Sequence, residues 1–218
     1  MRSRYSVAGG GLLLVGALGY FFSLQISQFI DGARYNVAEN FVSDLGTMCR
    51  TAPVLGRVCV ELPSHNLFDY SSVALGICLF ACSALFYSAF RSKVFTPLVA
   101  LSGVGVFGVG VFTEAAPAEH TVFSLIAFLF GGLAAIASYR IMRGYFGCFS
   151  VAMGAATILF LLLDSELIGL GLGVGGAERM VVYPELIWAM CFGGALLSQR
   201  HLPNTQQGEP PGSTDPKP

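Results

Sequence analysis

Acidic, basic, amide and imidazole side chains gather beside the ends of the long apolar segments of this sequence. Ionisable groups in such places are costly to bury, so they are usually paired or functional. A guanidinium group held by carboxylates is suited to bind a phosphate group through paired hydrogen bonds. The candidate binding residues are Asp44, Asn66, His120, Glu178 and Arg179.

His120 allows a second chemistry, because an imidazole beside a carboxylate can act as a general base. The candidate catalytic residues are His120 as the base and Asp44 or Glu178 as the group that orients it. With His65 and a carboxylate, His120 could instead form a two-His, one-carboxylate metal site. The structural alternative is that His120 and Arg179 neutralise Asp44 or Glu178 and fix the loops. We predict no cofactor and no bound metal, and the sequence does not decide whether the protein is an enzyme.

The cysteines offer two further features. Cys49 and Cys59 could form a disulfide in an oxidising compartment, where closing this short loop would contribute about 2 to 3 kcal/mol. Two free thiols are the alternative. Cys78 and Cys82 are one helical turn apart and belong to a stripe of small residues that lets another helix approach closely.

Three glycines have the spacing of a nucleotide-binding motif, but the residues around them do not fit such a site. Gly171, Gly173 and Gly176 fit the pattern G-x-G-x-x-G, but no strand precedes them and no acidic residue follows at the required distance. We interpret them as part of a loop over residues 164–179. The glycines of the third apolar segment predict a thin helix that packs closely against its neighbours. They are Gly103, Gly105, Gly108 and Gly110.

The composition decides the environment in which all these residues work. Of the 218 residues, 54% are hydrophobic and only 11% are charged, and the mean hydropathy is +0.68. A water-soluble domain carries charge at roughly a quarter of its positions. This chain lacks the polar surface to cover a globular core, so its solvent is a lipid bilayer. The net charge of −1 offers no basic surface for a nucleic acid.

The positioning elements are therefore membrane-spanning helices, each of which needs about 20 mostly apolar residues. The apolar residues run all round each segment, which is typical of buried or lipid-facing helices. We predict an all-α fold, a polytopic membrane bundle of six transmembrane helices within residues 1–200. The predicted spans are 6–25, 71–90, 94–112, 121–141, 145–163 and 180–197.

The charges on the connections predict the orientation of the bundle, because Lys and Arg are retained on the cytoplasmic side. Basic residues dominate the side that holds both termini: Arg2, Arg4, Arg91, Lys93, Arg140, Arg143, Arg200 and Lys217. Acidic residues dominate the other side: Asp31, Glu39, Asp44, Glu61, Asp69, Glu114, Glu119, Asp164, Glu166, Glu178 and Glu185. We expect a multi-pass protein of the cell membrane with both termini in the cytoplasm. The alternative for residues 1–19 is a cleaved signal peptide.

Two connecting segments are long enough to have structure or disorder of their own. Residues 28–70 form a long extracytoplasmic loop, in which Ala33, Val37, Phe41, Leu45 and Met48 have the spacing of one face of an amphipathic helix. Residues 201–218 are rich in Pro, Gly, Gln and Thr and have almost no apolar residues, so we expect a disordered cytoplasmic tail.

Several short motifs resemble those of domain-of-unknown-function family 998, which comprises small prokaryotic membrane proteins with about six spans. The motifs are Ser43-Asp44-Leu45-Gly46, Asn66-Leu67-Phe68, His120, Glu178-Arg179, Tyr183-Pro184 and Trp188. The resemblance runs from the first span to the sixth and implies no established activity. The Ser-Asp-x-Gly element alone is similar to the Frag1/DRAM/Sfk1 group, some members of which are linked to lipid remodelling or lipid distribution.

These observations favour a membrane protein without enzymatic activity that binds or organises a lipid headgroup or a partner through its outward polar cluster. A lipid-modifying enzyme within the membrane is the first alternative, and a transporter of small solutes or a proton-coupled transporter is the second. The expected partners are membrane lipids, and a second copy of the chain or another membrane protein is a further possibility. A nucleic acid is not expected.

Overall fold

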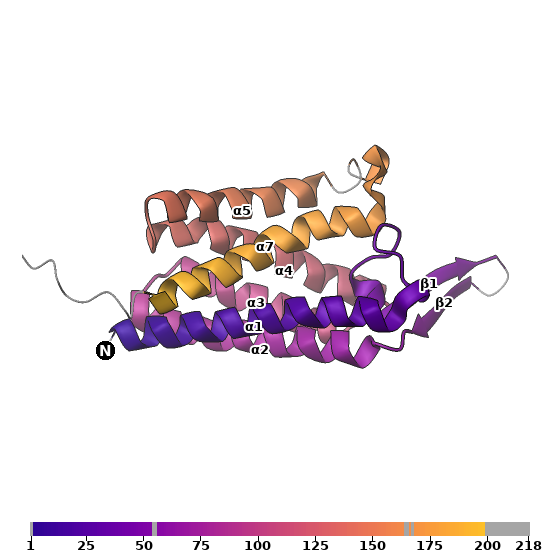
Figure 1. Ribbon diagram of the computed structural model, residues 1–218, viewed down its shortest axis with the longest axis horizontal. Coiled ribbons are helices and arrows are strands. Elements are labelled where there is room, and N and C mark those ends of the chain that lie inside the picture. The colour runs from indigo at the N-terminus through magenta and orange to yellow at the C-terminus, as the bar shows by residue number, and fades with distance from the viewer. Residues whose placement is uncertain (1, 54–55, 164–165, 167, 199–218) are drawn as a thin grey trace, which may run out of the picture.

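The computed structural model describes residues 2–53, 56–163, 166 and 168–198, and it is a bundle of helices (Figure 1). Among the described residues, five helices are long and apolar enough to cross a membrane, and another apolar helix of 17 residues is shorter. The structure therefore confirms a polytopic membrane bundle. The helices are α1 (Arg2–Asp31), α2 (His65–Phe90), α3 (Phe95–Val111), α4 (Pro117–Ala137), α5 (Tyr145–Leu162) and α7 (Gly173–Ser198). The tail predicted at 201–218 lies outside the described residues.

The two ends of the bundle differ. The described part of the chain begins in α1 and ends in α7 at one end, and a β-hairpin projects from the other (Figure 1). We call these the terminal end and the hairpin end. Helix α1 packs against α2 and α7, α3 lies between α2 and α4, and α5 packs against α4 and α7.

Small residues bring the helices close together, as the sequence predicts. A Cβ atom at Gly105 in α3 would collide with the backbone of Ala127 in α4. The thiol of Cys82 in α2 lies 3.3 Å from the carbonyl oxygen of Gly9 in α1. Such contacts allow dispersion between backbones to stabilise the bundle where water supplies no hydrophobic driving force.

Aromatic rings fill the core towards the terminal end. The ring of Phe95 lies 5.6 Å from that of Phe86 and 5.5 Å from that of Phe192, measured between centroids. Trp188 stacks on Phe192 at 5.5 Å. Because aromatic pairs at these distances contribute beyond their buried area, this cluster joins α2, α3 and α7 firmly.

The connection between α1 and α2 corrects a prediction. The expected amphipathic helix is not formed, and the chain instead makes two short 3₁₀ turns followed by an antiparallel hairpin. The turns are Gly32–Arg34 and Ser43–Leu45, and the strands are β1 (Thr47–Ala52) and β2 (Gly56–Glu61). Cys49 and Cys59 face each other across the two strands and are joined, which confirms the possible disulfide.

Side-chain hydrogen bonds explain why the apolar residues of this connection have helical spacing but form no helix. The amide oxygen of Asn40 accepts from the backbone of Asn36 at 2.8 Å, and a carboxylate oxygen of Asp44 accepts from the backbone of Phe41 at 3.0 Å. Asn and Asp side chains compete in this way with the hydrogen bonds of a helix. The apolar residues therefore do not share a face: Leu45 is fully buried, whereas Val37 is 47% exposed.

The last helix begins at Gly173, earlier than the predicted start at residue 180. Gly171 and Gly173 have positive φ angles of 90° and 70°, which glycine adopts without strain, and they turn the chain into α7. The backbone N–H of Gly175 then donates to the carbonyl of Ala38 at 2.9 Å. Glu178 and Arg179 consequently lie on the first turns of a helix, not in a loop.

Candidate functional site

Three consecutive residues tie the hairpin end together. Residues 35–46, which we call the cap segment, cross this end of the bundle. The backbone N–H of Val42 donates to a carboxylate oxygen of Glu178 in α7, and the hydroxyl of Ser43 donates to Oε1 of Glu114 at 2.9 Å. Asp44 contacts the hairpin. The cap segment is thereby fixed to α7, to the α3–α4 connection and to β1.

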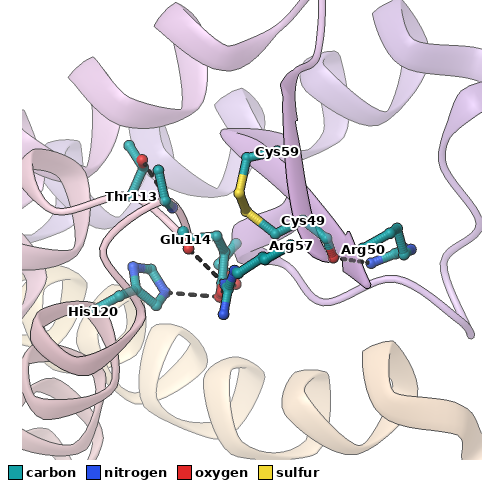
Figure 2. The surroundings of a disulfide bond; sticks show 9 residues. Cys49, Arg50, Arg57, Cys59, Thr113, Glu114 and His120 are labelled. Atoms are coloured by element: carbon teal, nitrogen blue, oxygen red, sulfur yellow. Dashed lines mark hydrogen bonds and ion pairs between the residues drawn. A yellow bond between two sulfur atoms is a disulfide. The ribbon is translucent and has the colours of Figure 1, made fainter. Parts of the chain in front are cut away.

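Glu114 is the centre of the polar contacts between the hairpin and α4 (Figure 2). Its Oε1 lies 3.3 Å from Nε2 of His120, and its Oε2 lies 3.3 Å from the guanidinium of Arg57 in β2. The other ring nitrogen of His120 donates to the carbonyl of Phe112 at 2.7 Å. The carboxylate beside His120 is therefore Glu114 and not Asp44 or Glu178.

Asp44 is buried and has its own partners. Its Oδ2 accepts from the side-chain amide of Asn40 at 3.0 Å and lies 3.5 Å from the guanidinium of Arg50 in β1. Because Asp44 is 2% exposed, these donors replace the water that a carboxylate otherwise requires. Its geometry is that of a structural anchor for the cap segment and the hairpin.

Arg179 is also buried, and two of its three hydrogen bonds reach the cap segment. Its Nη1 donates to the carbonyls of Val37 and Gly175 at 2.9 and 2.8 Å, and its Nη2 donates to the hydroxyl of Tyr35 at 2.6 Å. Burial raises the pKa of Tyr35 to about 12, although the nearby Arg179 lowers it. The neutral hydroxyl of Tyr35 then donates to the carbonyl of Phe41 at 2.9 Å.

The structure does not join all the predicted site residues. Asn66 is exposed near the start of α2. His65 contacts the carbonyl of Leu62 and the carboxylate of Glu61, so its partners differ from those of His120. Within the described ranges no group of three His, Cys, Asp or Glu side chains could hold a metal ion. The two-His metal site considered from the sequence is therefore not assembled there.

A cavity lies beneath the cap segment and extends into the bundle. It offers about 70 Å³ to the centres of water molecules, and its walls are mostly apolar. The polar lining nearest the hairpin end comes from Ser43, His120 and Glu178, and the far lining includes Trp188 and Ala189. At about 1.5 Å per residue, the stretch of α7 from Glu178 to Ala189 measures roughly 16 Å. The cavity is thus long and narrow.

Glu185 is a residue of this cavity that does not belong to the site predicted from the sequence. It lies halfway along α7, and one oxygen is 3.3 Å from the hydroxyl of Ser102 in α3. Its predicted place is the end of a span, because the helix was expected to begin at residue 180. A single acidic residue within the last apolar segment was the available signal, since ionisable groups at membrane depth usually mark function.

Residues 14–195 match the model of a protein family described as a protein of unknown function, DUF998. The matched range includes the cap segment, the hairpin and every residue that lines the cavity. Searches of curated proteins and of solved structures give no significant match.

Proposed function

Because this chain belongs to the DUF998 family, whose description states no activity, its function must be inferred from its own geometry, and we propose that it binds a single-chain lipid inside the bundle. The protein is a multi-pass membrane protein of apolar helices. The observation that carries the proposal is the long apolar cavity with a polar group of residues at one end.

The shape of the cavity supports one hydrocarbon chain as its occupant. About 70 Å³ for the centres of water molecules, distributed over roughly 16 Å, is narrow for a branched or double-chained molecule. Apolar walls with a few polar groups are typical of sites for small hydrophobic ligands. The polar end of the lipid would lie beside Ser43, His120 and Glu178, below the cap segment.

The proposal assigns Arg179 a different role from the phosphate contact expected from the sequence. Its Nη1 and Nη2 groups already donate to two carbonyls and a tyrosine hydroxyl, and the residue is only 4% exposed. In this proposal Arg179 positions the cap segment, which closes the polar end of the cavity. The lipid is held by the cavity itself.

Filling the cavity tests the proposal. Val106 in α3 lines it, whereas Val104 on the same helix is exposed on the outer surface. We expect Val106→Phe to reduce the amount of copurified single-chain lipid about tenfold, because the added ring occupies the space of the chain. Native mass spectrometry of the protein released from nanodiscs measures this amount.

Val104→Phe is the matched control, because it adds the same volume on the other side of the helix. It should retain the lipid content of the unmodified protein. Equal lipid content in all three proteins would contradict the proposal, as would the absence of any bound single-chain lipid from the unmodified protein.

A further inference from the structure

The middle of the bundle holds a carboxyl group that three helices surround. Glu185 is roughly 18 to 20 Å from the two ends of α7, at about 1.5 Å per residue. Gly131 in α4 leaves the space for it, because a Cβ atom there would overlap Oε1 of Glu185. Ser102 in α3 offers its hydroxyl. The sequence thus provides a place for this carboxyl group within the hydrocarbon region.

The hydrogen bonds of Glu185 are incomplete. The hydroxyl of Ser102 has one hydrogen, and it lies as close to the carbonyl of Ala127, at 3.2 Å, as to Oε1 of Glu185, at 3.3 Å. In the described part of the chain, Oε2 of Glu185 has no hydrogen-bond partner and no Lys, Arg or His forms an ion pair with this residue. A carboxyl group that faces a cavity in this situation requires a cation, a donor from elsewhere or a proton of its own.

The side chains that line the cavity do not supply a cation for Glu185. Its described lining contains the carboxyl groups of Glu178 and Glu185 but neither Lys nor Arg. His120 is the basic side chain in that lining, and it already faces Glu114. Glu178 accepts the backbone N–H of Val42, whereas Glu185 contacts only a hydroxyl that lies equally close to the carbonyl of Ala127. A ligand that complements this cavity would therefore carry a positive charge on an apolar chain.

Resting on the lipid-binding function proposed above, we infer that Glu185 binds the protonated amine of a single-chain hydrophobic amine lying in the cavity. The ammonium group donates to Oε2 of Glu185 and supplies the missing counter-charge. The apolar wall holds the hydrocarbon chain. The aromatic side chains of Phe128 and Trp188 also line the cavity, and aromatic faces attract cations.

Trp188 provides the measurement, because it is the single tryptophan of the sequence and lines the cavity. The protein, in nanodiscs of uncharged phosphatidylcholine, is titrated with dodecylamine, dodecanol or dodecanoate while Trp188 emission is recorded. The three probes share one chain and differ in the charge of the polar group. We expect dodecylamine to saturate the signal at a concentration at least about tenfold lower than the other two, since hydrogen bonds to charged groups have this magnitude.

Two variants assign the effect to Glu185. Glu185→Gln keeps the shape of the side chain, and Gly131→Ala leaves the carboxyl group but displaces it. Each should weaken dodecylamine binding about tenfold or more, so that the preference for dodecylamine over dodecanol is lost. Glu119→Gln removes an exposed carboxylate at the start of α4 and should change neither dodecylamine binding nor dodecanol binding.

The outcomes separate this inference from the function on which it rests. If all three probes bind equally well, and Glu185→Gln changes nothing, the cavity binds chains without regard to charge and the inference is wrong. A preference for dodecylamine that survives in both variants would also overturn it. If no probe changes the emission of Trp188, the proposed lipid-binding function fails as well.

Discussion

Arg179 joins two segments that lie far apart in the sequence. Its guanidinium in α7 donates to the carbonyl of Val37 and to the hydroxyl of Tyr35, so the buried charge is held by oxygen atoms of the cap segment. The ring of Tyr35 lies 5.6 Å from the guanidinium carbon, which adds a cation–π contact. Removing such a buried charge lowers stability mainly because the oxygen atoms that it contacted are left without a donor.

We expect Arg179→Ala to lower the free energy of unfolding by about 3 kcal/mol, because two carbonyls and a tyrosine hydroxyl lose a charged donor. Thermal unfolding in detergent, followed by the emission of Trp188, measures the change. Arg34→Ala removes an exposed arginine from the same end of the bundle and should have almost no effect. Similar stability of the two variants would show that the contacts of Arg179 are dispensable.

For the individual site residues, the sequence identified the ionisable groups but not the partners that each one contacts. Asp44, His120, Glu178 and Arg179 are all buried or partly buried near the hairpin end, as expected from their positions. The partner of His120, however, is Glu114, which was one of many acidic residues on the connections. Pairing depends on how the cap segment crosses the bundle, and residue types alone do not contain that information.

The helices and the hairpin show what spacing can and cannot predict. The long apolar helices were predictable because the hydrocarbon layer imposes both length and composition on a span. The connection between α1 and α2 was not, because apolar residues at helical intervals occurred beside Asn40 and Asp44, whose side chains bond the local backbone. The start of α7 was hidden by glycines that commonly mark loops and here allow close packing against Ala38.

The hairpin depends on its disulfide more than on a core, because every residue of β2 is exposed. We expect replacement of Cys49 and Cys59 by alanine to destabilise the hairpin locally by about 2 to 3 kcal/mol, the value for closing a loop of this length. Hydrogen exchange measured by mass spectrometry should become faster in β1 and β2 and remain unchanged in α4 and α5. Uniformly faster exchange through the helices would contradict a local role.

The bundle as a whole separates charge between its two ends. The terminal end carries basic residues such as Arg91, Lys93 and Arg143, whereas the hairpin end carries most of the acidic residues and the disulfide. Basic residues are retained in the cytoplasm, and disulfides persist in oxidising compartments. From these two features we predict that the hairpin end lies outside the cytoplasm.

Cysteine labelling on intact cells tests this orientation. Single cysteines are introduced as Glu119→Cys at the hairpin end or Lys93→Cys at the terminal end, after the free cysteines Cys78, Cys82, Cys148 and Cys191 are replaced by alanine. A membrane-impermeant maleimide should label the cysteine at 119 without lysis and the cysteine at 93 only after it. The reverse labelling pattern would show that the hairpin end faces the cytoplasm.

The position of the cap segment has a consequence for how a ligand reaches the interior. Val42 and Ser43 line the cavity and are held by Glu178 and Glu114, so two hydrogen bonds hold the cap segment over its polar end. On the lipid-binding proposal, we expect the ligand to enter from the hydrocarbon layer, so that selection among ligands begins with how well each one partitions into the surrounding lipid.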